Sequence, residues 1–364
     1  MYAIIKAGGT YVPLDPEYPP ARLAEMTRAL TCIVTLDTLL DHLPSLSIPI
    51  YPIDVEWGKI LQYKDTNPTI SITADFPVYV LFTSGSTGQP KGVVITHSAL
   101  INHMLWYLDA FRFTNRDIVL QKTVFTFDSS VCEFFAPLMV GAKLVLARRA
   151  AHGDWNYLLD ALQENQITVL QVVPTVLELL IKDSRFIACE SLRVLISGGE
   201  ALSTELVNRI NQKMDVELYN LYGPTEITID ATYQTCTENL LSNTVTIGRP
   251  IWNIQAYILD KYYKPVPPGV PGELFLAGAG LALGYIHQMA ITADRFIPNP
   301  FSSKAGSRMY RTGDAARYTQ EGEIEFLGRL DSQVKIRGNR VELGDIESVL
   351  REFPDISESI AHVY

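Results

Sequence analysis

The sequence has few cysteines and no long apolar run. Its 364 residues include four cysteines, which are scattered and form no C-x-x-C pair: Cys32, Cys132, Cys189 and Cys236. This usage suits a reducing compartment such as the cytoplasm better than a disulfide framework. No run of 18 apolar residues occurs, and the opening MYAIIKAGG is too short for a secretory signal and lacks a cleavage site. We therefore expect neither a membrane partner nor secretion.

Positive charge is also scarce. The chain carries 30 Lys and Arg against 40 Asp and Glu, a formal net charge of −10. Non-specific nucleic-acid binding requires a basic face, so we do not expect nucleic acid as a partner. A local cluster of cations or backbone amides can still bind an anionic ligand. The six histidines show no metal-ligand spacing, and no Ser/His/Asp triad is evident.

Hydrophobic residues make up 47% of the chain and charged residues 19%, as in a globular protein. From residue 1 to about 244, short β-rich runs alternate with helical stretches. Strands are expected at 32–36, 77–83, 117–122, 142–147, 167–173, 192–198 and 216–223, and helices at 97–109, 131–140, 154–165, 174–182 and 203–213. This alternation predicts an α/β fold of layered, largely parallel βα sheets.

The pattern changes after residue 244. Short strands separated by Pro/Gly turns predict a distorted antiparallel β-barrel over 245–330, which completes a core of residues 1–330. Residues 331–364 hold one strand, one Gly turn and one helix. They are too few to bury a core alone, so we expect a hinge and the start of a small C-terminal α+β subdomain. We also expect an N-terminal truncation, because YAIIKAGGTYVPLDPEYPP suggests a helix end running into a turn.

Small and hydroxylated residues follow the strand expected at 77–83, in YVLFTSGSTGQPKGVVITH (79–97). Glycines let a ligand approach the main chain, hydroxyls can donate to anionic oxygens, and Lys91 adds a positive charge. The spacing fits neither the P-loop nor the dinucleotide G-x-G-x-x-G. In isolation, such a stretch is more often a surface turn.

Six further motifs accompany this loop along the chain. They are IKAGGTYVPLDPEYPPARL (5–23), FDSSVCE (127–133), NLYGPTE (220–226), GELFLAGAGLALGY (272–285), YRTGD (310–314) and GRLDSQVKIRGNRVELGDIE (328–347). Together the seven resemble the adenylation domain of a nonribosomal peptide synthetase, in the adenylate-forming superfamily, over nearly all of the chain. The resemblance implies that ATP and Mg²⁺ convert an amino acid to aminoacyl-AMP and pyrophosphate. It implies two partners in the same synthetase: a condensation domain, and a peptidyl carrier whose phosphopantetheine thiol accepts the aminoacyl group.

The resemblance also implies the residues that handle ATP. The attacking carboxylate is already anionic, so the site needs no base and must instead bring two anions together. Thr225 is implied at the α-phosphate, Glu226 as the Mg²⁺ ligand, Lys335 between nucleotide and acyl phosphate, and Asp331 as the hinge. Further nucleotide contacts are implied for Tyr222 and Asn220 at adenine, Asp314 at the ribose, and Arg329 at ribose or phosphate. The resemblance also places seven residues at the phosphates: Thr83, Ser84, Gly85, Ser86, Thr87, Gly88 and Lys91. Nucleotide contacts are implied in general for Gly199, Leu221 and Phe326.

Asp128 indicates the substrate class, because amino-acid-activating relatives place an acid there to pair with the α-ammonium group. The alternative is a helix N-cap. Matching by the family's spacing puts the side-chain pocket at Asp128, Ser129, Cys132, Gln171, Ile196, Gly198, Leu221, Ile229 and Asp230. The polar end formed by Gln171 and Asp230 favours glutamine, with arginine as the alternative because Asp230 is acidic. Glutamate would need a protonated or compensated Asp230, and each pocket residue could equally be strand packing.

The chain departs from the family pattern at a few points. Leu283 stands where Arg is usual and Ala315 where Leu is usual, and both positions look peripheral. The family's C-terminal Lys is absent, so we expect this chain to bind nucleotide and amino acid but to adenylate slowly. An acyl- or aryl-CoA ligase and a non-catalytic docking module are the alternative interpretations. Asp128 argues against the first, and the intact ATP and Mg²⁺ positions argue against the second.

Overall fold

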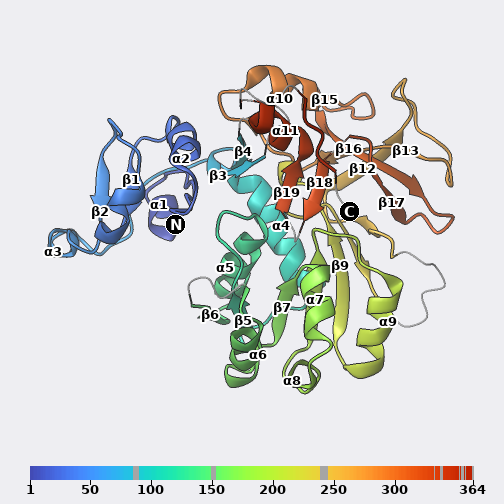
Figure 1. Ribbon diagram of the computed structural model, residues 1–364, viewed down its shortest axis with the longest axis horizontal. Helices are drawn as coiled ribbons and strands as arrows, with labels where there is room; N and C mark the ends of the chain where they lie inside the picture. The colour runs from blue at the N-terminus through green and yellow to red at the C-terminus, as the bar shows by residue number, and fades with distance from the viewer. Residues whose placement is uncertain are drawn as a thin grey trace.

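The computed structural model describes residues 1–84, 90–148, 153–237, 245–331, 333–336, 339–351, 353, 356 and 358–362. Its largest sheet has seven strands in the order β11-β10-β9-β8-β7-β5-β6. The strands are β5 (Ile118–Gln121), β6 (Lys143–Leu146), β7 (Val169–Val172), β8 (Val194–Gly198), β9 (Glu217–Tyr222), β10 (Thr232–Thr235) and β11 (Arg249–Pro250). β5 to β9 pair with one another in parallel, β10 pairs antiparallel with β9, and β11 pairs antiparallel with β10. The layered, largely parallel arrangement predicted from the alternating pattern is confirmed (Figure 1).

Helices cover both faces of this sheet. They are α4 (His97–Ala110) and α5 (Ser129–Met139) on one side, and α6 (Trp155–Glu164), α7 (Pro174–Leu180), α8 (Ser184–Ile187) and α9 (Thr204–Lys213) on the other. Val119 packs in the cluster with α4 and α5, whereas its neighbour Leu120 packs in the cluster with α6, α7 and α9. Successive strand residues point to opposite faces, so a sheet covered on both sides needs strands that are apolar throughout.

Two expected strands lie outside the parallel sheet. β3 (Pro77–Thr83) pairs antiparallel with β4 (Lys91–Thr96), and β14 (Gly284–Tyr285) adds a third strand. Only residues 84–90 join β3 to β4, and a parallel pair would need a crossover of a dozen residues or more. β3 and β4, which flank the Ser/Gly-rich stretch, therefore pair antiparallel. β1 (Ile33–Thr35) forms a separate two-stranded parallel sheet with β2 (Ile50–Pro52).

A second, antiparallel sheet follows in the order β12-β13-β16-β15. It comprises β12 (Ile254–Leu259), β13 (Gly272–Gly278), β15 (Phe296–Pro298), β16 (Arg308–Tyr318) and β17 (Ile324–Arg329), with α10 (Met289–Arg295) before β15. β16 is 11 residues long, so β15 and β17 pair with successive parts of it. This curled sheet corresponds to the predicted barrel-like region (Figure 1). The predicted boundary at 244–245 adjoins residues 238–244, which lie outside the described residues.

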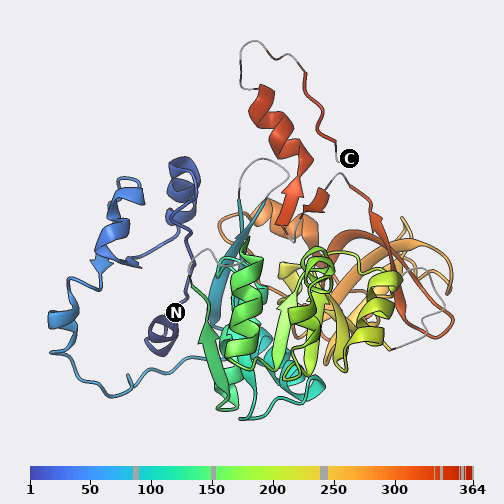
Figure 2. The same cartoon turned by 60° about the horizontal axis from the view of Figure 1, so that its bottom comes forward.

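The two ends of the chain form smaller units. The N-terminal one holds α1 (Tyr2–Lys6), α2 (Pro20–Thr27), η1 (Asp37–His42) and α3 (Trp57–Ile60), and it stands beside the main body in both views (Figures 1 and 2). The C-terminal one holds β18 (Gln333–Ile336), β19 (Asn339–Glu342) and α11 (Leu343–Arg351). The prediction of a single strand here is wrong, because the chain reverses after Ile336 and pairs with itself antiparallel. None of the described helices has the length and apolar character needed to cross a membrane.

Candidate active site

A carboxylate with two donors lies where the two large sheets meet. Tyr222, the last residue of β9, donates its hydroxyl to Asp314 on β16. Arg329 on β17 donates from Nη1 to Asp314 Oδ1 at 2.8 Å, and the ring of Phe326 lies 6.1 Å from that of Tyr222. Burial and the Asp314 carboxylate raise the pKa of Tyr222 well above its usual value. Four residues predicted to hold the nucleoside are thus brought together.

Asp331, predicted as the hinge residue, belongs to the same network. Arg329 donates from Nε and Nη2 to the two oxygens of Asp331, at 2.8 and 2.5 Å, and from Nη1 to the Thr312 carbonyl at 2.8 Å. Burial alone would lower the pKa of Arg329, but the carboxylates of Asp331 and Asp314 outweigh it and raise that pKa. A guanidinium that binds both acids links the ribose position to the start of the C-terminal unit.

A second contact joins residues predicted for the nucleotide and for the amino acid. After β9 the chain turns at Gly223 and Pro224 into η3 (Thr225–Ile227). The Thr225 hydroxyl donates to Asp128 Oδ2 at 2.5 Å. Asp128 occupies the N-cap position of α5 but makes no capping hydrogen bond with its side chain. Helix capping therefore does not account for its carboxylate.

Glu226, the predicted Mg²⁺ ligand, lies in a buried polar cluster. Its side chain is fully buried, and the Tyr285 hydroxyl donates to Oε1 at 2.7 Å. Lys91 is also buried, with Nζ 6.0 Å from the Tyr285 ring centroid. Tyr285 was not singled out from the sequence, although it ends the GELFLAGAGLALGY motif. A carboxylate oriented by a neutral hydroxyl suits a hard cation such as Mg²⁺.

The predicted side-chain pocket lines one face of the seven-stranded sheet. Gln171 and Ile196 are directly paired across β7 and β8, and Leu221 pairs with Gly198 one row further along. By alternation, all three side chains share the face of Val169 and its cluster with α4 and α5. Cys132 of α5 is buried in that cluster. The pocket residues thus come from two layers that pack against each other.

A strained segment brings Asp230 to the same place. Thr228 and Ile229 have positive φ values of 66° and 70°, and the Thr228 hydroxyl donates to the Gly280 carbonyl at 2.7 Å. A Cβ at Gly223 would lie 2.2 Å from the Ile229 carbonyl oxygen, so only glycine fits there. Strain of this kind persists where surrounding contacts over-determine it, often at functional sites.

The strained segment ends in a buried cluster that sequence reasoning missed. His103 on α4 meets Asp230 with Nε2 and Oδ2 3.0 Å apart. The ligand-type atoms of His103, Cys132 and Asp230 all lie within 4.8 Å of one another. The available signal was His103, one of two histidines in the apolar helix HSALINHMLWYLDA, and sequence spacing alone does not connect it to a residue 127 positions away.

The structure gives a position for three further predicted residues, Asn220, Gly199 and Ser129, but no side-chain hydrogen bond from them to another predicted site residue in the described part of the chain. Asn220 donates from Nδ2 to the Thr246 carbonyl at 2.9 Å and lies on the sheet face opposite Leu221. Gly199, directly after β8, has a φ of 86°. Ser129 begins α5. Gly85, Ser86, Thr87, Gly88 and the side chain of Lys335 lie outside the described residues.

Several buried polar atoms near these residues have no hydrogen-bond partner in the described part of the chain. They include Tyr79 Oη, Thr83 Oγ1, His103 Nδ1, Gln171 Oε1, Ser197 Oγ and Thr232 Oγ1. Native proteins leave few such atoms. Gln171, Ser197 and Thr232 lie at the carboxyl edge of the parallel strands, where open α/β sheets bind their ligands. Thr83 ends β3, at the start of the Ser/Gly-rich loop.

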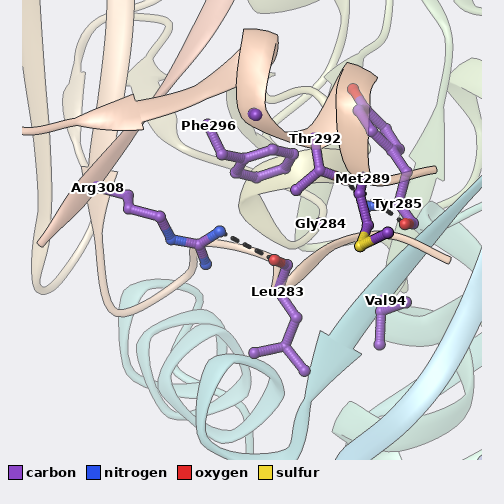
Figure 3. Close-up of a pocket in the computed structure, with 9 residues that line it drawn as sticks. Val94, Leu283, Gly284, Tyr285, Met289, Thr292, Phe296 and Arg308 are labelled. Atoms are coloured by element: carbon purple, nitrogen blue, oxygen red, sulfur yellow. Dashed lines mark hydrogen bonds between the residues drawn. The ribbon is translucent and has the colours of Figure 1, made fainter. Parts of the chain in front are cut away.

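A surface pocket of about 450 Å³ opens between β4, β14 and α10 (Figure 3). Tyr285 lines it and also carries the hydrogen bond to Glu226. Arg308 donates to the Leu283 carbonyl at 2.9 Å (Figure 3). The Leu283 side chain is 45% exposed, as fits a position judged peripheral.

The model of the family described as "AMP-binding enzyme" matches residues 1–286. The chain belongs to the AMP-binding enzyme family. This AMP-binding enzyme is 46% identical over 351 residues to Tyrocidine synthase 3 of Brevibacillus parabrevis, a match that covers 96% of this chain and 5% of that protein. The chain therefore spans a small part of the curated relatives that it matches.

Solved structures agree in fold. An artificially fused adenylation–PCP di-domain nonribosomal peptide synthetase from Klebsiella oxytoca matches with a TM-score of 0.86 and 27% identity, over 98% of this chain and 71% of that one. A four-domain nonribosomal peptide synthetase bound to AMP and glycine matches with a TM-score of 0.78 and 35% identity, over 98% of this chain and 26% of that one. The AMP-binding enzyme described here thus has the core of a nonribosomal peptide synthetase adenylation domain, as the sequence motifs predicted.

Proposed function

We propose that this chain activates an amino acid with ATP, and that the aminoacyl group then passes to the phosphopantetheine thiol of a carrier protein during nonribosomal peptide synthesis. The observation that carries the proposal is the 2.5 Å hydrogen bond between Thr225 and Asp128. It brings together the residue predicted at the α-phosphate and the residue predicted at the substrate α-ammonium. One reaction centre can then lie between them.

The chemistry follows from this arrangement. Asp128 binds the α-ammonium group, which places the substrate carboxylate beside Thr225. A carboxylate oxygen attacks the α-phosphorus, the bond from that phosphorus to the bridging β-phosphate oxygen breaks, and pyrophosphate leaves. The main task of the protein is to align two anions and to stabilise the charge that develops. In the transfer step the carrier thiol loses its proton, its sulfur attacks the acyl carbon, and AMP leaves.

The nucleotide is held at its two ends. Asp314 accepts the ribose hydroxyl hydrogens, oriented by Tyr222 and Arg329, and the rings of Tyr222 and Phe326 supply an apolar surface for adenine. At the other end, the Thr83 hydroxyl, which has no partner among the described residues, can donate to phosphate oxygens. The Ser/Gly-rich loop, Lys91 and Lys335 complete the predicted phosphate contacts.

Glu226 fits the Mg²⁺ that the family uses. It is a buried carboxylate, oriented by the Tyr285 hydroxyl, and it directly follows Thr225 in η3. Oxygen donors of this kind are what Mg²⁺ prefers. When bound, the ion supplies positive charge against the phosphate oxygens. In the described part of the chain, the Tyr285 hydroxyl orients the Glu226 carboxylate.

The arrangement of the chain and its partners belongs to the same proposal. Residues 1–330 act as the adenylation core, and residues 331–364 act as the hinge at Asp331 and as part of a C-terminal α+β subdomain. Carrier and condensation domains of one synthetase are the partners, and the cytoplasm is the compartment. The ion pair between Arg329 and Asp331 supports a hinge role, because a change of hinge conformation must alter a contact that also holds Asp314.

An ATP–pyrophosphate exchange panel of the twenty amino acids tests the proposal. We expect one or a few amino acids to stimulate exchange, and glutamine to be the strongest. Asp128→Asn should lower amino-acid-dependent kcat/KM by about 100-fold or more, because the α-ammonium loses its only charged partner. Asp109→Asn, an exposed acid-to-amide change on α4, is the matched control and should behave as wild type.

An acyl- or aryl-CoA ligase is the second candidate. It would share the nucleotide residues but would not need Asp128. Turnover with simple carboxylic acids and coenzyme A, together with silence for all twenty amino acids, would establish that candidate instead. An Asp128→Asn protein that activates its substrate at the wild-type rate would lead to the same conclusion.

A further inference from the structure

The contact between His103 and Asp230 is buried on both sides. The His103 side chain is 1% exposed and that of Asp230 is 8% exposed, with Nε2 and Oδ2 3.0 Å apart. The His103 ring stacks on Tyr107 at 5.9 Å and meets the edge of Trp106 at 5.4 Å. Packing against two aromatic rings fixes the imidazole, so Nε2 is held in place against the carboxylate.

Within the described residues, His103 is the one ion-pair partner of Asp230. The other groups on which the charge of Asp230 acts include the Tyr79 and Tyr107 hydroxyls and the Cys132 thiol, none of which is a cation. Burial, followed by the charges of Asp230 and Asp128, raises the pKa of the Cys132 thiol well above its usual value. An uncompensated carboxylate in such a place costs several kcal/mol. The imidazole lies within hydrogen-bond distance of this carboxylate and occupies one of its oxygens.

We propose that His103 is a positioning residue of the substrate pocket, which compensates the charge of Asp230 and so selects an uncharged amide side chain over a cationic one. The inference rests on the proposed function and narrows its substrate class. Asp230 left open a choice between glutamine and arginine. The imidazole favours glutamine over arginine, because it already occupies the carboxylate that a guanidinium would need.

Charge counting gives the physical reason. A guanidinium in this pocket would have to share the Asp230 carboxylate with His103, or displace His103 and leave a buried imidazole without its partner. A primary amide brings no charge. Its N–H groups can donate to Gln171 Oε1, a buried acceptor with no partner among the described residues, on the sheet face that packs against α4 and α5. Glutamine therefore fits without the desolvation of an unpaired charge.

The first test compares substrates in His103→Leu. We expect the ratio of kcat/KM for arginine to that for glutamine, measured by pyrophosphate exchange, to rise by about 30-fold or more, because Asp230 is then free to take a cation. Ile101→Ala, a change at an exposed position on the same helix, is the control and should leave the ratio unchanged. A His103→Leu ratio within about threefold of wild type overturns the proposal.

Two further variants separate charge from hydrogen bonding. His103→Gln keeps a neutral N–H donor near the Nε2 position but cannot carry charge. We expect it to use arginine better than wild type, whereas a wild-type ratio would show that hydrogen bonding alone is needed and would overturn the charge mechanism. In His103→Leu/Asp230→Leu the gain for arginine should vanish, because its cause is the freed carboxylate. A gain that persists in the double variant overturns the proposal.

Asp230→Asn covers the case in which the histidine variants do not fold. It leaves His103 without its carboxylate, so the pocket becomes more favourable to an anionic side chain. We expect the kcat/KM ratio of glutamate to glutamine to rise by about tenfold, and arginine to be used even less. Improved use of arginine in Asp230→Asn overturns the proposal.

The wild-type panel separates this inference from the proposed function. If no amino acid supports exchange, and isothermal titration in the presence of ATP detects no binding of glutamine, glutamate or arginine, both are overturned. If wild type activates arginine or an apolar amino acid best, the function holds and the role of His103 is refuted. A preference for glutamine that weakens towards arginine in His103→Leu supports both.

Discussion

Buried polar groups are hydrogen-bonded at the amino ends of the parallel strands, whereas several at the carboxyl ends have no partner among the described residues. At the amino ends, Asp117 directly precedes β5 and accepts hydrogen bonds from Arg193 Nε at 2.8 Å and Nη2 at 2.9 Å, from the Thr168 hydroxyl at 2.8 Å, and from Thr114 N at 2.8 Å. Thr168 and Arg193 precede β7 and β8 in the same way. This network closes one edge of the sheet with each carboxylate oxygen occupied.

The carboxyl ends are the contrast. Gln171 Oε1, Ser197 Oγ and Thr232 Oγ1 are buried there without a partner among the described residues. Nearby, the backbone at Thr228 and Ile229 is strained. A folded chain tolerates such costs where a ligand removes them. One sheet therefore shows a saturated edge that contributes to stability and an unsaturated edge that is available for binding.

The largest effect is expected from a substitution that removes the central carboxylate of the saturated edge. Asp117→Asn should lower the free energy of unfolding by about 3 kcal/mol, because the nearly buried carboxylate loses the charge that strengthens its hydrogen bonds from Arg193, Thr168 and Thr114. Urea unfolding followed by tryptophan fluorescence measures the loss. The order of preference among amino acids in the exchange panel should not change. A changed order would show that the two edges are not independent.

The same variant has a pH signature. Burial alone would raise the pKa of Asp117, but Arg193, Thr114 and Thr168 outweigh it and lower that pKa. A lowered pKa in the folded state stabilises the protein above the unfolded value of about 4, and the contribution is lost as pH falls through the folded value. The difference in unfolding free energy between wild type and Asp117→Asn should be constant from pH 5 to 7 and should shrink below about pH 4. A difference that grows with acidification contradicts this sign.

The next effect concerns Asp314, which accepts from Tyr222 at the carboxyl end of β9. Asp314→Asn should weaken AMP binding by about 10- to 100-fold, because a charged acceptor for the ribose hydroxyls becomes a neutral amide. Isothermal titration with AMP measures it. The free energy of unfolding should change less than in Asp117→Asn. Unchanged AMP affinity would remove Asp314 from the nucleotide site.

A smaller effect is expected at Tyr285. Tyr285→Phe removes the hydroxyl that orients Glu226 and keeps the ring that lines the adjoining pocket (Figure 3). The Mg²⁺ concentration for half-maximal exchange should rise by about tenfold, as is typical when a residue behind a metal ligand is lost. Saturating Mg²⁺ should restore most of the rate. No shift in the Mg²⁺ titration would mean that Glu226 does not bind the metal.

The smallest effect compares the same substitution at the two edges. Thr168→Val removes a hydroxyl that donates to Asp117 and accepts from Ile118 N at 2.9 Å, so it should destabilise by about 1 kcal/mol or more. Thr232→Val removes a buried hydroxyl without a partner in the described residues, so it should stabilise by about 1 kcal/mol. Chemical denaturation of both variants measures the two signs. Equal signs would refute the contrast between the edges.

Much of the architecture could be predicted from local sequence. The runs at 117–122, 167–173 and 192–198 became β5, β7 and β8 because both faces of a covered sheet require continuous apolar residues. The stretch at 97–109 became α4 through its helical periodicity. The pairing of 77–83 with 91–96 was not expected, because strand partners depend on the geometry of the connection, and a single-strand pattern does not report it.

Part of the site was predictable for a different reason. Tyr222, Asp314 and Arg329 were identified by motifs that resemble a known family, and the structure brings the three into contact. Two hydrogen-bond partners of predicted site residues were not predicted. Tyr285 reaches Glu226 across 59 positions and His103 reaches Asp230 across 127. Neither sequence separation matches the short repeat of a helix or a strand, because both contacts join elements that are far apart in the sequence.

The sequence by itself determined the elements, their order and the residue types at the ends of the strands, because these depend on propensity and pattern within a few neighbouring residues. Only the tertiary structure decided which polar groups meet. It paired Asp117 with Arg193, Thr225 with Asp128, and Asp230 with His103. The physical reason is that the groups packed around a buried charge set its free-energy cost and its pKa. Packing between layers, rather than proximity along the chain, supplies those groups.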